Sequence, residues 1–204
     1  MTSDRETITD SHLSITIESS NLGYDGFRKV VTYQYREDQS GVSAKRELVR
    51  GQHAVAVVAY DPDLNQLVMI RQFRLGAQLG VGKGLSVELA AGLIDEGEDA
   101  QTAAARELKE ETGLDAIAIK PMCRFLTTPG LTDEVLNIYY AEVDARDLVG
   151  EAGHASESEQ TFPFLLSLEE ALSAIDSNDI NNGIVMIGLM WFARHKDQLL
   201  DAST

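Results

Sequence analysis

Three glutamates are placed to do chemistry together. A helix is predicted over Asp99–Thr112, and it carries Glu107, Glu110 and Glu111. At 100° per residue, Glu107 and Glu111 fall among the alanines at 103–104, and Glu110 lies just beside them. Alanines on such a face are expected to pack inward. The three carboxylates therefore share the predicted inner face, whereas an ordinary run of helix charges points to solvent.

Like charges at this spacing destabilise a helix by a few tenths of a kcal/mol per pair, and partial burial adds to that cost. A divalent cation removes the repulsion, and clustered carboxylate oxygens are the ligands that Mg²⁺ or Mn²⁺ prefers. Arg106 on the neighbouring face can hold one carboxylate in position. Gly92 and Gly97 give the preceding turn the freedom to bring backbone carbonyls towards a metal.

The segment from residue 92 to 114 resembles the Nudix box, G-x5-E-x7-R-E-U-x-E-E-x-G-U. All nine fixed positions match, at Gly92, Glu98, Arg106, Glu107, Leu108, Glu110, Glu111, Gly113 and Leu114. The resemblance implies an α/β fold, the Nudix α/β/α sandwich with a mixed sheet, plus a small N-terminal antiparallel β-region. It also implies metal-assisted hydrolysis of a nucleoside diphosphate linked to another group.

Features outside the box are similar to bacterial ADP-ribose pyrophosphatases. They are Pro129, sixteen residues after Gly113, the run Ile180–Gly183 before an apolar helix, and the N-terminal strand region. In such enzymes the N-terminal region is exchanged between two subunits and helps to build each active site. The resemblance thus implies a homodimer, which would supply a core for a region too small to have its own. The alternative for Pro129 is a simple turn proline.

The resemblance also assigns roles within the box. It implies that Glu107 and Glu111 are the main metal ligands, with Glu110 near them as a catalytic residue and the carbonyl of Ala91 as a further ligand. The resemblance implies that Glu98 and Arg106 stabilise the structure of the box. Arg106 is also a candidate catalytic residue, and Glu98 is also a candidate metal ligand.

The polar segment 145–160 is predicted to be a long loop, and such loops within compact domains are often functional. It resembles the loop that supplies a catalytic base and a metal ligand in ADP-ribose pyrophosphatases. We assign Glu157 as the base and Glu159 as the ligand. Serines at 156 and 158, where acidic or amide residues are common, leave the choice between the two glutamates open, and an ordinary polar loop is the alternative.

Substrate-binding candidates are aromatic and basic. Tyr24 and Phe27 can stack on adenine from the partner subunit, and Arg46 and Arg74 can meet phosphates. Pro129 joins them through the resemblance. The alternative is that these are strand aromatics and surface arginines.

Two domains are expected: an N-terminal β-region over residues 1–50 and a Nudix hydrolase domain over residues 51–204. Turns between the N-terminal strands are expected at residues 21–26 and 38–41. The glycines at 76–84 are interpreted as a hairpin connection and not as a phosphate cradle. Expected strands cover residues 13–18, 29–35, 45–49, 53–60, 66–73, 85–90, 117–126, 135–143 and 162–166. Further helices are expected over residues 168–176 and 182–199, and the second, apolar nearly all round, should be largely buried.

The whole chain of 204 residues has 17 basic and 33 acidic residues, a formal charge of −16. This acidic balance disfavours nucleic acid and anionic membrane as partners, because the protein has no excess of basic residues to neutralise their negative charge. Nine acids against two bases fall between Glu88 and Asp115, so a metal can invert the charge there. The chain has one cysteine, Cys123, and its N-terminus does not resemble a signal peptide, so a reducing cytoplasm is expected. The four histidines are scattered along the sequence, so a zinc site is not expected.

Taken with these features, the resemblance implies one functional hypothesis, Mg²⁺-dependent hydrolysis of ADP-ribose to AMP and ribose 5-phosphate. Two alternatives stay open. One is a different Nudix substrate, such as GDP-mannose, another nucleotide sugar or a dinucleotide. The other is a non-catalytic ADP-ribose-binding sensor, which the intact box disfavours.

Overall fold

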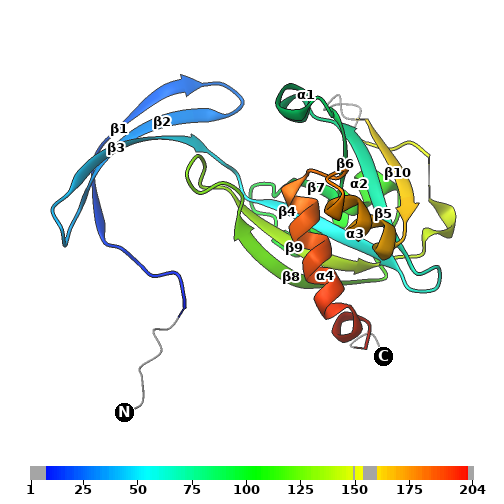
Figure 1. Cartoon of the computed structure of the whole chain (residues 1–204). Helices are drawn as coiled ribbons and strands as arrows, with labels where there is room; N and C mark the ends of the chain where they lie inside the picture. Colours follow the sequence, from blue (N-terminus) through cyan, green and yellow to red (C-terminus); the bar gives the residue numbers. More distant parts are fainter. Residues whose placement is uncertain (1–7, 149, 154–159, 202–204) are drawn as a thin grey trace, which may run out of the picture. The chain divides into compact units, whose positions relative to one another are not determined.

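The computed structural model describes residues 8–148, 150–153 and 160–201. These divide into two compact units (Figure 1). The first unit contains the chain up to Gly51 together with residues 128–133. The second contains residues 52–127 and the chain from Glu134 onwards. Each unit is described by itself.

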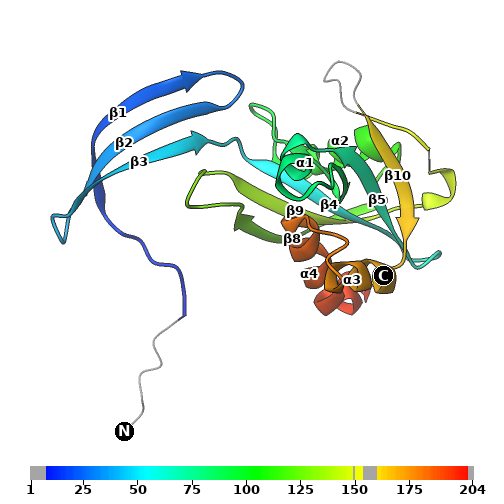
Figure 2. The same ribbon diagram turned by 45° about the horizontal axis from the view of Figure 1, so that its top comes forward.

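The first unit is a three-stranded antiparallel sheet in the order β1-β2-β3, drawn in blue in Figure 2. Its strands are β1 (Ile15–Asp25), β2 (Lys29–Glu37) and β3 (Ser43–Arg50). The turn predicted at residues 21–26 begins later than expected, because β1 runs on to Asp25 through two register shifts. Residues 26–28 alone make the connection, since the shifts absorb the turn-forming residues into the strand.

A seven-stranded mixed sheet forms the centre of the second unit. The main path runs β10-β5-β4-β9-β8, with β6 paired to β5 and β7 paired to β4. Among the described strands of this sheet, only β4 and β9 pair in parallel. The strands are β4 (Ala54–Asp61), β5 (Gln66–Phe73), β6 (Leu85–Glu88), β7 (Ala90–Leu93), β8 (Ala118–Leu126), β9 (Val135–Glu142) and β10 (Thr161–Leu166).

Helices cover both faces of this sheet, which gives the α/β/α sandwich that the sequence predicted (Figure 1). Alternate residues of β4 divide between two cores: Val55 and Val57 pack with helix α2 (Ala100–Thr112), and Ala56 and Val58 with helix α4 (Gly183–Asp201). Every β4 residue is buried, as expected for a strand covered on both sides. Helix α3 (Leu168–Asp176) lies beside α4 and begins with a capping box at Ser167 and Glu170.

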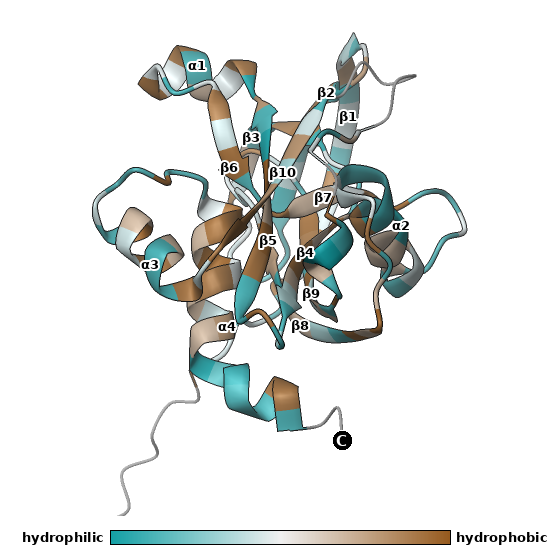
Figure 3. Cartoon of the chain, turned by 90° about the vertical axis from the view of Figure 1, so that its right-hand side faces the viewer, coloured by the Kyte–Doolittle hydropathy of each residue, from teal (hydrophilic) through white to brown (hydrophobic). Residues whose placement is uncertain are grey.

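Three expectations for the second unit need correction. The glycine-rich segment does join two antiparallel strands, but it contains helix α1 (Leu75–Val81). The strand predicted at 85–90 is two strands, because β6 pairs with β5 whereas β7 pairs with β4. Helix α4 is buried on one face only, since Met190 is 55% exposed. Its first half is apolar and its second half polar, as Figure 3 shows.

Candidate active site

Helix α2 holds the three glutamates as the helical wheel predicted. Its first turn is capped by the Asp99 side chain, and Gly113 ends it in the left-handed conformation with φ 76°. Ala103, Ala104 and Leu108 are fully buried against the sheet. These contacts fix the rotation of α2 about its axis, so the three glutamates lie on the side of the helix that packs towards the sheet.

The backbone of β7 receives two of the carboxylates. The amide of Ala91 donates to Oε2 of Glu111 at 2.8 Å, and the Glu111 residue is 3% exposed. Gly92 leaves the space that Glu107 fills, because a Cβ at position 92 would lie 2.0 Å from Oε1 of Glu107. Glu107 and Glu111 are therefore seated on consecutive residues of the same short strand.

Gly92→Ala is expected to displace the Glu107 carboxylate, because the two groups cannot share the space. We expect the variant to fold but to lose at least about 10²-fold in kcat, the scale on which misplaced catalytic groups act. Gly183→Ala is the matched control, since a Cβ there meets nothing within 4 Å. Steady-state kinetics of both variants check this prediction, and normal turnover by Gly92→Ala would contradict it.

Arg106 is the hub of the acidic cluster. Its guanidinium donates to both carboxylate oxygens of Glu98 at 3.0 and 2.9 Å, to Glu107 at 2.8 Å and to Glu110 at 3.2 Å. It also donates to the carbonyl of Leu93 at 3.0 Å. The hydrogen bond from Arg106 lowers the pKa of Glu98, and the same bond raises the pKa of Arg106. The sequence anticipated one such contact, whereas the structure has three carboxylates on this side chain.

Arg106→Gln is expected to destabilise the fold, because it leaves three neighbouring carboxylates without their shared cation. The lowered pKa of Glu98 means that its ion pair stabilises the wild type above the usual glutamate range and is lost as the pH falls through the lowered value. The melting temperature of the variant should therefore fall most at neutral pH.

Divalent cations supply the test of this explanation. Mg²⁺ should raise the melting temperature of Arg106→Gln more than that of the wild type, because a bound cation replaces the missing charge. Arg124→Gln makes the same charge change at an exposed position on β8 and should behave like the wild type. A melting temperature of Arg106→Gln equal to that of the control would contradict the prediction.

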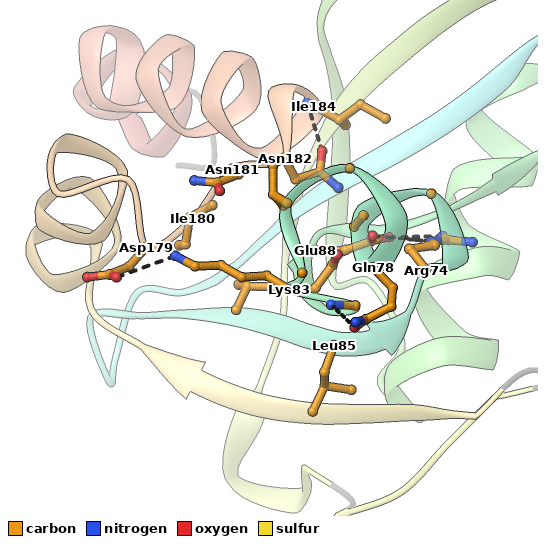
Figure 4. Close-up of a pocket in the computed structure, with 18 residues that line it drawn as sticks. Arg74, Gln78, Lys83, Leu85, Glu88, Asp179, Ile180, Asn181, Asn182 and Ile184 are labelled. Atoms are coloured by element: carbon orange, nitrogen blue, oxygen red, sulfur yellow. Dashed lines mark hydrogen bonds and ion pairs between the residues drawn. The ribbon is translucent and has the colours of Figure 1, made fainter.

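A second arginine, Arg74, lies on the same face of the sheet as α2. Arg74 donates three hydrogen bonds of 2.9 to 3.2 Å to the carboxylate of Glu88, which is 6% exposed (Figure 4). Glu88 stands opposite Ile70 in the β5–β6 pair. Cross-strand partners share a face, and Ile70 alternates with Val68, which packs in the α2 core. Arg74 and Glu88 therefore face the layer of the box glutamates.

A cavity of about 900 Å³ opens beside this pair. Figure 4 shows Arg74 and Glu88 on one side and, on another, the segment Asp179–Asn182 together with Ile184 at the start of α4. An ion pair of 3.7 Å between Lys83 and Asp179 lies at its rim. Ile180, Asn181 and Asn182 of the predicted run contribute to the lining, whereas Gly183 does not, and Asn182 accepts a hydrogen bond of 2.9 Å from the amide of Ile184.

Gly153 within the long loop and Thr161 directly after it are both attached to the last turn of α2. The amide of Gly153 donates to the carbonyl of Glu110 at 3.1 Å, and the hydroxyl of Thr161 donates to the carbonyl of Glu111 at 3.0 Å. Ala152 and Thr161 close the loop with two backbone hydrogen bonds. The bonds to Glu110 and Glu111 satisfy two backbone carbonyls that the end of a helix leaves without partners. Glu157 and Glu159 themselves lie outside the described residues.

Four of the predicted substrate-binding residues belong to the first unit. Tyr24 and Phe27 are 61% and 87% exposed, and Arg46 and Pro129 are also exposed. Arg46 donates to the carbonyl of Lys45 at 2.8 Å. The relation of these four residues to the box glutamates stays a prediction, and Arg74 is the substrate-binding candidate within the second unit.

The donor set of the cluster fits a hard divalent cation. It consists of carboxylate oxygens and the backbone of β7, without sulfur or imidazole. Within the described ranges, no group of three His, Cys, Asp or Glu side chains forms a ready-made cation site. Arg106 supplies the positive charge to Glu98, Glu107 and Glu110 instead.

Sequence reasoning missed two residues of this face, Glu88 and Gln72. The available signal for Glu88 was an acid inside a mostly apolar predicted strand that follows Arg74 in the sequence. Gln72 is 4% exposed and follows Ile70 on the same face of β5, two residues before Arg74. An amide within an apolar strand gives a similar signal.

The second unit is thus an α/β/α sandwich whose capped acidic helix is seated on a glycine-containing strand. Residues 51–184 match the NUDIX domain family model. The chain belongs to the Nudix family, and it is a hydrolase of the pyrophosphatase type.

Its relatives agree with this assignment. The ADP-ribose pyrophosphatase of Escherichia coli (strain K12) is 31% identical over 200 residues, 96% of each chain. The GDP-mannose pyrophosphatase of Cronobacter sakazakii is 30% identical over 150 residues, 71% of this chain and 78% of the relative. The crystal structure of an ADP compounds hydrolase shares the fold, with a TM-score of 0.74, 24% identity and coverage of 93% of this chain and 98% of that one.

Among the described residues, no helix is both long enough and apolar enough to cross a membrane.

Proposed function

We propose that this protein hydrolyses the diphosphate of ADP-ribose to AMP and ribose 5-phosphate in a Mg²⁺-dependent reaction in the cytoplasm. One observation carries the proposal: Glu107 and Glu111 are seated on β7, on the face that also presents Arg74. Carboxylates for a cation and an arginine for a phosphate are the two groups that a diphosphate substrate needs. The similarity to an ADP-ribose pyrophosphatase over 96% of the chain supports the choice of substrate.

The box glutamates would hold the cation. Glu107 and Glu111, the carbonyl of Ala91, Glu98 and Glu159 are the proposed ligands for Mg²⁺, with Mn²⁺ as a substitute. When bound, the cation would neutralise the diphosphate and polarise the attacking water. Direct contact between the glutamates and the substrate is disfavoured, because like charges repel.

Other residues of the chain would bind the substrate and move a proton. Glu157 is proposed as the base that accepts the proton of the attacking water, with Glu110 assisting. In sequence it is four residues from both Gly153 and Thr161, which are hydrogen-bonded to the last turn of α2. Arg74 would bind a phosphate from the wall of the 900 Å³ cavity.

We further propose a homodimer, in which the first unit of one chain completes the site of its partner. Ile15, Ile17 and Leu22 on β1 are each close to half exposed, and no residue of this unit is among the described buried core. Tyr24, Phe27, Arg46 and Pro129 would then reach the partner's substrate. A dimer would bury this apolar surface, which a monomer leaves in water.

Mixing two inactive variants tests the dimer. Glu111→Gln and Arg46→Ala chains should each be nearly inactive alone, yet regain activity after unfolding and refolding together, because one mixed site has both wild-type residues. A particle of the 22.3 kDa chain mass in light scattering, without complementation, would contradict it.

A parallel panel of nucleoside diphosphate compounds tests the substrate. ADP-ribose should have the highest kcat/KM, above GDP-mannose, other nucleotide sugars and dinucleotides. GDP-mannose is the second candidate, because a GDP-mannose pyrophosphatase is among the relatives. A higher kcat/KM for GDP-mannose would replace ADP-ribose in the proposal, and tight binding of ADP-ribose without hydrolysis of any compound would favour a sensor.

A further inference from the structure

Two buried side-chain atoms have no hydrogen-bond partner among the described residues: Oε1 of Gln72 and the hydroxyl of Tyr140. Gln72 is 4% exposed and Tyr140 is fully buried. A buried polar atom without a partner costs about 1–3 kcal/mol. Such an atom in a native fold therefore indicates a partner that is bound during function, or a plain defect in packing.

The two atoms lie on opposite faces of the sheet. Tyr140 belongs to the α4 core, where its ring stacks on Phe192 with centroids 5.9 Å apart. Gln72 alternates with Ile70 on the α2 face, directly opposite Ser86 on β6 and Thr161 on β10. Only Gln72 is thus on the face that holds the box glutamates.

Thr161 connects Gln72 to the metal-site helix. Cross-strand neighbours have Cβ atoms about 5 Å apart, so the amide of Gln72 lies beside the Thr161 side chain. The Thr161 hydroxyl donates to the backbone carbonyl of Glu111 at 3.0 Å. Gln72 is therefore two contacts away from a proposed metal ligand, and its own strand ends at Phe73, directly before Arg74.

The chemistry of the missing partner follows from the orphan atom. Oε1 of an amide only accepts, so it needs a donor. Carboxylates and a diphosphate carry no donor at neutral pH. A water molecule held by a divalent cation is a strong donor, because the cation polarises its O–H bonds.

We propose that Gln72 is a positioning residue of the metal site, with Oε1 accepting a hydrogen bond from a water molecule in the hydration shell of the divalent cation. This inference rests on the proposed metal-dependent function. Outer partners of this kind orient the ligands around a metal, and their loss costs about 10–100-fold in metal affinity.

Gln72→Leu and Tyr140→Phe form a matched pair, because each removes one orphan atom at nearly constant volume. Both variants should melt at or above the wild-type temperature without metal, since each loses an unsatisfied buried group. Their affinities for Mn²⁺ alone, measured by electron paramagnetic resonance without substrate, should differ. Gln72→Leu should bind Mn²⁺ about 10–100-fold more weakly, and Tyr140→Phe should bind it as the wild type does.

Gln72→Glu guards against a Leu variant that fails to fold, because it keeps an acceptor oxygen and should restore Mn²⁺ affinity. Wild-type affinity in folded Gln72→Leu would overturn the proposal, and so would a raised KM for ADP-ribose with unchanged Mn²⁺ affinity, which would assign Gln72 to the substrate. Normal Mn²⁺ binding by a wild type that hydrolyses no nucleoside diphosphate would refute the proposed function alone. Absence of Mn²⁺ binding by the wild type would refute both.

Discussion

Glu111→Gln is expected to nearly abolish turnover while the protein stays folded. The amide oxygen of glutamine can still accept the 2.8 Å hydrogen bond from Ala91, so the contact that seats residue 111 on β7 is kept. The substitution removes the negative charge with which residue 111 would bind the divalent cation. A metal contributes several kcal/mol of transition-state stabilisation, and loss of about 4 kcal/mol corresponds to about 10³-fold in rate.

Glu96→Gln is the matched control for this variant. Glu96 is an exposed acid of the same segment, so its change removes the same charge without touching the β7 contacts. The control should keep wild-type kcat and Mn²⁺ affinity. Turnover by Glu111→Gln within a few fold of the control, with both variants folded, would contradict a role for Glu111 as a metal ligand.

Glu157→Gln is expected to lower kcat by about 10²–10⁴-fold, the contribution of a general base. Because glutamine cannot accept the proton of the attacking water, the acid limb of the pH profile should also disappear. Metal binding should stay normal, since Glu157 is not a proposed ligand. Rate measurements across pH, combined with Mn²⁺ affinity, check both parts of this prediction.

Glu159→Gln is the informative comparison within the same loop. Because Glu159 is a proposed metal ligand, the Glu159→Gln variant should bind Mn²⁺ more weakly than the wild type. It should keep the acid limb of its pH–rate profile at saturating metal. Near-normal rates for Glu157→Gln, together with a lost acid limb in Glu159→Gln, would move the base to Glu159. Both side chains lie beyond the described residues, so kinetics alone decides between them.

The box helix could be predicted from sequence because its determinants are local. Asp99 and Gly113 mark its ends, and the alanines at 103–104 mark its inner face. The rotation inferred from the wheel is confirmed by the 3% exposure of Glu111. Its seating on Ala91 and Gly92 could not be derived, because a helical period says nothing about the strand packed against it.

The break between β6 and β7 was missed for a related reason. The two strands are nearly continuous in sequence, but they pair with different neighbours, β5 and β4. Strand pairing is non-local, so hydrophobic pattern alone reads them as one strand. The contact of Arg74 with Glu88 depends on that pairing and on α1, which separates the two residues in the chain.

The most direct test of the central claim is the fate of ADP-ribose with the purified chain in Mg²⁺ and in excess chelator. The account predicts equal amounts of AMP and ribose 5-phosphate with Mg²⁺, and no release of either product with chelator. AMP release at the same rate in chelator would contradict the metal-dependent site, and intact ADP-ribose in both conditions would contradict the proposed reaction.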